Sequence, residues 1–229
     1  MNIKKENAIL EVIEKFSDYS ELILHQLTLL EKIINSGSQL IPSDILEEIM
    51  SNEEKSDKFE IKLSEKIINT IVLQQPLASD LRKLMACYQM VINLERIGDL
   101  VINIVNFIPK IKDQEIYGIM TDVIYNMLIV TQNMVQKSIL SFTQGDREYA
   151  IWTIKNDPVV DEMNQKLVKK VISKTGLPEE TRQILLSFIH TNSIISSIER
   201  IADHATNVAE ATIYALDGTD IRHQNKEEK

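Results

Sequence analysis

Four pairs of acidic residues, each with members four positions apart, are the part of this 229-residue sequence most suited to chemistry. A spacing of four places two side chains on the same face of a helix. The pairs are Glu53/Asp57, Glu95/Asp99, Asp157/Asp161 and Glu199/Asp203. Like charges at this spacing repel each other, and a bound cation would remove the repulsion. The four pairs are therefore candidate metal ligands.

The pairs are related by an internal repeat. LERIGDLVIN at 94–103 aligns with IERIADHATN at 198–207, and the same offset of 104 positions brings Asp57 onto Asp161. The matched residues are polar, so a shared helical composition does not explain them. Two other acidic pairs, Glu14/Asp18 and Asp44/Glu48, lie outside these sets. We infer that the chain consists of two homologous halves.

The chemistry of the donors limits the metals that such a site would bind. Carboxylate oxygens favour Mg²⁺, Ca²⁺, Mn²⁺ or Fe³⁺. Cys87 is the single cysteine, which argues against a cysteine-built zinc site, and the four histidines are scattered. Adjacent pairs could hold more than one ion, as in di-iron carboxylate bundles, but the Glu-x-x-His motif of those bundles is missing. The other interpretation is a solvated face on which Arg96 and Arg200 make local ion pairs. His204 stands beside Asp203, where it could reach a bound ion, but a satisfied surface histidine is the favoured interpretation.

The elements that would position these carboxylates are helices. Apolar residues recur at alternating spacings of three and four, most regularly in the third segment at 87, 90, 94, 97, 101, 104 and 108. This period of about 3.5 residues is typical of helices packed nearly antiparallel in a bundle. On the third helix Glu95 and Asp99 lie nearly opposite the apolar seam, which predicts an outward polar stripe. The predicted helices are 3–35, 43–74, 77–108, 113–143, 147–175 and 178–215.

Glycines and prolines are few, and most stand where a predicted helix begins or ends. Gly37 and Gly145 are expected to close helices in the left-handed conformation. Pro76 and Pro178 are expected at first helical positions. Pro158 lies inside a helical segment, so we expect a kink or short break there. No sustained alternation of apolar and polar residues indicates a strand. The fold class predicted is all-α, with two tandem three-helix bundles over 1–110 and 111–218 and a polar tail at 219–229.

Composition excludes several classes of protein. The net charge of −9 and the pI near 5.0 argue against binding to nucleic acid. No apolar run approaches the roughly 18 residues that a membrane-spanning helix needs. The N-terminus shows no signal peptide, and the single cysteine is typical of a reducing compartment, so we expect a cytoplasmic location.

Motifs of catalysis are also missing. The sequence contains no glycine-rich phosphate loop, no Gly-x-Ser-x-Gly and no kinase signature. No nucleophile or oxyanion donor set accompanies the carboxylates. We therefore expect no enzyme, and the alternative is a metal-dependent phosphatase or a ferritin-like oxidase built on helical carboxylates.

Three segments resemble the PhoU family of bacterial phosphate-specific transport accessory proteins. They are QPLASDLRKLMACYQMVINLERIGDL at 75–100, NDPVVDEMNQKLV at 156–168 and SIERIADHATNVAEATIYALDGTDIRH at 197–223. The resemblance implies two similar three-helix bundles whose four acidic pairs bind multinuclear clusters of iron or zinc. The second block has Ala202 where the family usually has glycine, as at Gly98. Leu100 stands where some relatives have histidine, so no ligand is expected there.

The resemblance also implies a function. PhoU-like proteins act at the cytoplasmic face, between the ATPase subunit of the phosphate ABC transporter and the phosphate-sensing histidine kinase. They keep the phosphate-starvation response off when phosphate is plentiful, and they restrain phosphate uptake. We therefore expect this chain to be a negative regulator and an adaptor. We expect it to form a homodimer and to reach the membrane only through its partners.

Overall fold

Six long helices make up the part of the chain that the structure describes. The computed structural model describes residues 3–172 and 180–222. The helices are α1 (Ile3–Asn35), α2 (Ser43–Gln74), α3 (Ser79–Phe107), α4 (Gln114–Gln144), α5 (Arg147–Ile172) and α6 (Glu180–Asp217), with a short 3-10 turn, η1 (Ile108–Lys110), after α3. No strand occurs in the described ranges. The all-α prediction is confirmed, and the helix ends agree within two residues wherever they are described. The predicted ends at 175 and 178 and the residues 223–229 of the predicted tail lie outside the described residues.

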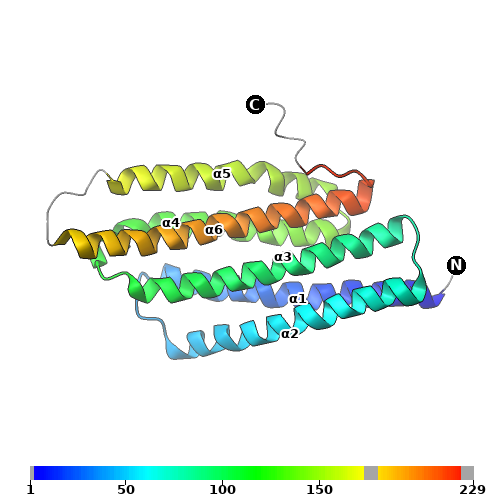
Figure 1. Ribbon diagram of the computed structural model, residues 1–229. Coiled ribbons are helices and arrows are strands. Elements are labelled where there is room, and N and C mark those ends of the chain that lie inside the picture. The colour runs from blue at the N-terminus through cyan, green and yellow to red at the C-terminus, as the bar shows by residue number, and fades with distance from the viewer. Residues whose placement is uncertain (1–2, 173–179, 223–229) are drawn as a thin grey trace.

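The helices form two antiparallel three-helix bundles that lie side by side (Figure 1). α1, α2 and α3 contact one another, and so do α4, α5 and α6. The bundles meet where α3 packs along α6 and α1 packs along α4. Over the described residues, the outermost helices, α2 and α5, contact only helices of their own bundle. The predicted architecture of two tandem three-helix bundles is therefore confirmed.

The apolar seam predicted on the third helix forms the centre of the core. Its seven members, from Cys87 to Ile108, are all buried. Apolar residues of α1 such as Phe16, Ile23 and Leu27 are fully buried against it. A single continuous set of buried side chains runs through both bundles, because α3 and α6 bury apolar faces against each other. Helices with such a seam obtain most of their stability from packing rather than from helix propensity.

The connection between the bundles is fixed to α6. It follows η1 and consists of residues 111–113, before α4 begins. Ile111 is buried, and the backbone N–H groups of Lys112 and Asp113 both donate to Ser187 Oγ at 3.1 Å. Asp113 then caps α4 by accepting from the N–H of Ile116 at 3.0 Å.

Gly37 and Gly145 follow helix ends with φ angles of 64° and 69°, as predicted. The expectations for two prolines were wrong. Pro76 does not begin α3, which starts at Ser79, because Gln75 ends α2 in the left-handed conformation and Pro76 is buried in the connection. Pro158 does not break α5, which continues through it. Pro158 is exposed, so water can reach the carbonyl group that the proline leaves without a donor.

None of the helices in the described residues is both long and apolar enough to cross a bilayer.

Candidate metal centre

The fold brings the four acidic pairs together two by two. Glu53/Asp57 on α2 face Glu95/Asp99 on α3, and these four residues are called the first carboxylate cluster. The second carboxylate cluster consists of Asp157/Asp161 on α5 and Glu199/Asp203 on α6. Each bundle therefore carries one cluster, on an outer helix and the neighbouring helix of the central α3–α6 pair, whose positions Figure 1 shows.

Glu53 is the most strongly perturbed member of the first cluster. Burial, together with the neighbouring carboxylates of Asp99 and Asp57, raises the pKa of Glu53 to about 7. A single hydrogen bond opposes them: Gln26 Nε2 on α1 donates to Glu53 Oε2 at 3.1 Å. A carboxylate in this environment is stabilised by binding either a proton or a cation.

Glu95 is perturbed in the same direction. Burial raises the pKa of Glu95, and the carboxylates of Asp99 and Glu60 add to the effect. Arg96 opposes it, since its Nε lies 3.4 Å from Glu95 Oε2 and its Nη1 lies 3.2 Å from Asp99 Oδ2. The local ion pairs of the alternative interpretation are thus present at Arg96. The side chains of Glu95 and Asp99 are 22% and 40% exposed. The predicted stripe is outside the core, as expected, but it is turned toward α2 rather than fully outward.

A buried amide and a glycine complete the first cluster. Gln26 is fully buried, and its Oε1 has no hydrogen-bond partner. A methyl group added at Gly98 would lie 3.1 Å from Gln26 Oε1 and 3.3 Å from Glu53 Oε2. The glycine therefore lets α3 approach the two oxygens closely. An unpaired buried carbonyl oxygen beside a carboxylate is a donor set that suits a hard cation.

The sequence analysis did not identify Gln26. The sequence did contain a signal for it, because Gln26 lies between Ile23 and Leu27 on the buried face of α1. A polar side chain is costly to bury there unless it makes a hydrogen bond. The contact with Glu53 could not be predicted from helical spacing, because the two residues are 27 positions apart and lie on different helices.

The second cluster is built differently. Burial raises the pKa of Asp157, which accepts a hydrogen bond from Thr206 Oγ1 at 3.1 Å, and Asp203 and Asp161 raise that pKa further. Desolvation by surrounding atoms raises the pKa of Asp203, and the carboxylates of Asp161 and Glu199 add to it. Each half thus has four carboxylates, and the pKa is raised for Glu53 in the first half and for Asp157, its counterpart in the repeat, in the second.

The partners of those carboxylates are not repeated. At the offset of 104, Gln26 corresponds to Val130 and Gly98 corresponds to Ala202. Ala202 is buried, and its methyl group stands at the position where Gly98 has only a hydrogen atom in the first half. The position of Gln26 thus carries no amide in the second half, where Asp157 accepts from the Thr206 hydroxyl group.

His204 is directed away from the second cluster. Its Nδ1 lies 2.9 Å from Asn93 Oδ1 on α3, and Asn207 Nδ2 donates to the same oxygen at 3.2 Å. Burial lowers the pKa of His204, and the charges of Arg200 and Arg96 lower it further. A neutral, half-buried histidine of this kind joins α6 to α3.

The carboxylates are adjacent without being arranged around one point. Within the described residues, no three His, Cys, Asp or Glu side chains are placed as the ligands of one ion. The residues supply carboxylate oxygens that carry the same charge and are mostly part-buried, with Arg96 near the first cluster and Arg200 near the second. These donors suit hard divalent or trivalent cations, and binding would require rotation of side chains such as Asp57, which is exposed.

The fold and the clusters define a class of protein: a tandem pair of three-helix bundles with a carboxylate cluster on each. The sequence profile of the PhoU domain matches residues 16–108 and 124–212, which cover both bundles. The chain belongs to the PhoU family.

Relatives and solved structures agree with this assignment. A phosphate-specific transport system accessory protein PhoU homolog of Burkholderia sp is 32% identical over 79% of this chain and 76% of its own length. The Aquifex aeolicus homolog is 29% identical over 96% of this chain and 99% of its own. The crystal structure of PhoU from Pseudomonas aeruginosa has a TM-score of 0.79 at 24% identity, covering 93% of this chain and 99% of that one. The regulatory protein PhoU from Streptococcus pneumoniae has a TM-score of 0.81 at 18% identity, covering 95% and 99%. The two structures support the fold.

Proposed function

We propose that this chain is a cytoplasmic accessory protein of a phosphate transport system. It holds the phosphate-starvation response off when phosphate is plentiful and restrains phosphate uptake. The observation that carries the proposal is the match of the PhoU domain to both halves of the chain, among relatives described as phosphate-specific transport system accessory proteins. Its proposed partners are the ATPase subunit of the phosphate ABC transporter and the phosphate-sensing histidine kinase.

The same proposal covers assembly and location. An accessory protein of this kind would be held at the membrane by its partners alone, and two copies would form a homodimer. The net charge of −9 supports protein partners over nucleic acid.

The two carboxylate clusters are proposed metal sites. Their ligands would be the eight residues Glu53, Asp57, Glu95, Asp99, Asp157, Asp161, Glu199 and Asp203. The resemblance favours a multinuclear cluster of iron or zinc, while the oxygen donors also suit Mg²⁺, Mn²⁺ or Ca²⁺. The raised pKa values of Glu53, Glu95, Asp157 and Asp203 support the proposal, because they indicate negative charge that the protein itself leaves incompletely compensated. A bound metal would supply that compensation and would join the two helices that carry each cluster.

Genetic replacement tests the regulatory role. The chain is produced in a bacterial strain that lacks its own PhoU, and alkaline phosphatase activity is measured in medium rich in phosphate. We expect the strain without the chain to express the phosphatase and the strain with the chain to repress it. Expression that stays high although the protein is present and folded would contradict the proposal.

An assay of turnover tests the catalytic alternative. The purified protein is supplied with iron, manganese or magnesium and offered phosphate monoesters or oxygen. An accessory protein should show no turnover above that of the metal alone. Metal-dependent turnover that is lost in Asp99→Ala or Asp203→Ala would favour the helical carboxylate enzyme.

A further inference from the structure

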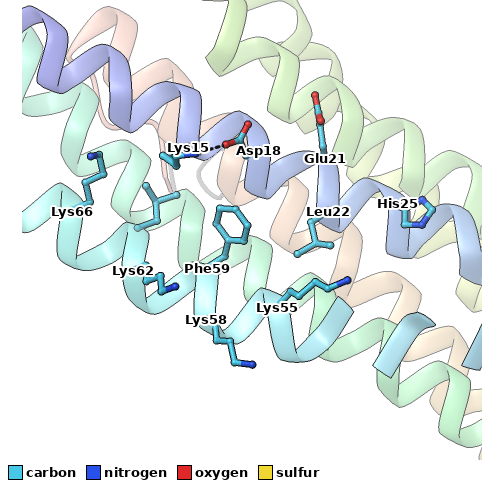
Figure 2. A pocket seen from close by; sticks show the side chains of 11 residues that line it. Lys15, Asp18, Glu21, Leu22, His25, Lys55, Lys58, Phe59, Lys62 and Lys66 are labelled. Atoms are coloured by element: carbon cyan, nitrogen blue, oxygen red, sulfur yellow. Dashed lines mark hydrogen bonds and ion pairs between the residues drawn. The ribbon is translucent and has the colours of Figure 1, made fainter. Parts of the chain in front are cut away.

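A groove separate from both carboxylate clusters runs between α1 and α2. It has a volume of about 880 Å³ and an apolar floor that includes Leu22, Phe59 and Leu63. Figure 2 shows the Phe59 ring standing between the two helices, with Leu22 beside it. The ring stacks on Tyr19, with a centroid distance of 5.6 Å and an interplanar angle of 15°. The floor is therefore held in place before anything binds.

One rim of the groove is a row of lysines. Four of them come from α2 at spacings of three and four, which places them on one side of that helix. They are Lys55, Lys58, Lys62 and Lys66, and Lys15 of α1 adds a fifth lysine to the lining. The row extends for about 16 Å along α2 at 1.5 Å per residue. It is a basic surface on a chain whose net charge is −9.

Much of this positive charge is available to a ligand. Lys55 donates to the amide oxygen of Asn52 at 3.1 Å, and among the described residues it has no carboxylate partner. Lys58 lies 3.9 Å from Glu54, and both side chains are largely exposed, so that pair is weak. In the described part of the chain, Lys62 has no ion-pair partner. Lys66 is the exception, because its Nζ pairs with Glu11 Oε1 of α1 at 2.5 Å. Lys55, Lys58 and Lys62 therefore keep most of their positive charge for a ligand.

The opposite rim has a different character. Asp18 and Glu21 of α1 line it, and Lys15 Nζ pairs with Asp18 Oδ2 at 2.7 Å. The groove is thus basic on the α2 side and slightly acidic on the α1 side. A ligand that fits should carry acidic groups on one edge only.

We propose that the groove binds a short amphipathic helix of a partner protein, about three turns long, with acidic side chains along one edge. Apolar residues at i, i+3, i+4 and i+7 would pack on Phe59 and its neighbours, and the acidic edge would face the lysine row of α2. The inference rests on the proposed adaptor function, to which it adds one docking surface and the chemistry of the segment bound there.

Two other ligands fit the groove less well. A free polyanion would find the lysines but would leave the apolar floor unused, and it would gain nothing from Phe59. An anionic membrane is nearly flat, whereas the floor is recessed between two helices and cannot reach the acyl chains. An amphipathic helix uses both the floor and the rim.

A binding experiment tests the chemistry. The probe is a fluorescent 14-residue peptide with leucines at helical spacing and glutamates along one edge, and fluorescence anisotropy measures its dissociation constant with the full chain. We expect the double variant Lys58→Glu/Lys62→Glu to bind the peptide about tenfold more weakly than the wild type. The control Lys112→Glu/Lys155→Glu makes the same change of charge outside the groove and should stay within about twofold.

Further probes separate the alternatives. A peptide of glutamates without leucines and vesicles of phosphatidylglycerol should bind much more weakly than the amphipathic peptide. The variant Phe59→Ala should weaken binding of the amphipathic peptide but not binding of the polyglutamate peptide or the vesicles. The proposal is overturned if the groove variant binds like the wild type, or if polyglutamate or vesicles bind as tightly as the peptide. It is also overturned if the dissociation constant of the peptide with the wild type is above about 100 μM.

The cellular assay distinguishes this proposal from the function on which it rests. With both variants shown to be folded by circular dichroism, the groove variant should fail to repress alkaline phosphatase and the control variant should repress it. Repression by both variants would overturn the groove as a regulatory surface and leave the proposed function intact. Failure of the wild type to repress alkaline phosphatase would contradict the proposed function. The peptide measurements would then still show whether the groove binds an acidic amphipathic helix.

Discussion

At the scale of single residues, Glu53 has the environment most dependent on its neighbours. It lies on α2 and receives a hydrogen bond from Gln26 of α1. The carboxylate of Asp99 comes from α3. Three helices therefore determine whether Glu53 carries a proton, a charge or a metal.

This environment predicts a dependence of stability on pH. The pKa of Glu53 is raised to about 7 in the folded protein, so the metal-free fold is destabilised by this group as the pH rises from its unfolded pKa toward 7. After allowance for partial exposure, we expect Glu53 to contribute about 1–2 kcal/mol to the loss of unfolding free energy between pH 5 and pH 8. The raised pKa values of Glu95, Asp157 and Asp203 act in the same direction.

Urea denaturation of metal-free protein at several pH values measures this dependence. The variant Glu53→Gln cannot titrate and should lose part of the slope, while Glu14→Gln, an exposed change outside the clusters, should keep it. A slope unchanged in Glu53→Gln would mean that the group is not perturbed.

At the scale of the elements, α5 tolerates a proline in its interior. The helix runs from Arg147 to Ile172 through Pro158, although proline removes one hydrogen bond and crowds the preceding turn. Packing keeps the segment helical, since Val160 is buried in the core. The proline is therefore a local cost that tertiary contacts offset.

Replacement of this proline should stabilise the protein. Pro158→Ala restores the backbone N–H group that proline lacks, and the exposed position leaves room for the new side chain. The change should raise the unfolding free energy by about 1 kcal/mol or more. Thermal and urea denaturation measure the change. Pro109→Ala serves as the control, because Pro109 lies in the 3-10 turn η1 and should give little or no gain. An equal gain at both positions would contradict the explanation.

The acidic pairs also belong to this scale, because each cluster needs two neighbouring helices. If the clusters bind metal independently, Asp99→Ala should remove metal from the first and Asp203→Ala from the second, each lowering the total by about half. Elemental analysis after mild purification measures the content. Glu14→Gln, from an acidic pair outside the clusters, should retain the metal of the wild type. Equal content in all four proteins would rule out these ligands.

At the scale of the whole molecule, the two bundles share one core. α3 and α6 lie along each other, and the buried set of side chains is continuous across them. His204 and Asn207 of α6 also contact Asn93 of α3. Neither bundle can be removed without exposing an apolar face of the other.

Division of the chain should therefore destabilise both halves. Residues 1–110 produced alone should aggregate or unfold with a much lower midpoint than the intact chain, because the face of α3 that packs on α6 becomes exposed. Size-exclusion chromatography and circular dichroism measure this, and addition of residues 111–229 should restore folding. A fragment that unfolds at the midpoint of the intact chain would show that the bundles are independent.

Much of this structure was determined by local patterns. The period of 3.5 on the third helix predicted its seam because burial repeats with the helix itself, and the offset of 104 predicted two bundles because homologous sequences adopt the same packing. The pairing of carboxylates within a helix followed from the spacing of four.

What lay between helices required the tertiary structure. The contact of Gln26 with Glu53 and the close approach at Gly98 depend on where α1, α2 and α3 meet, and helical spacing within one segment carries no information on that. The same holds for the lysine groove, which exists only because α1 lies beside α2. The fold of each helix is local in origin, whereas charge and burial at a site are the sum of contributions from segments far apart in the chain.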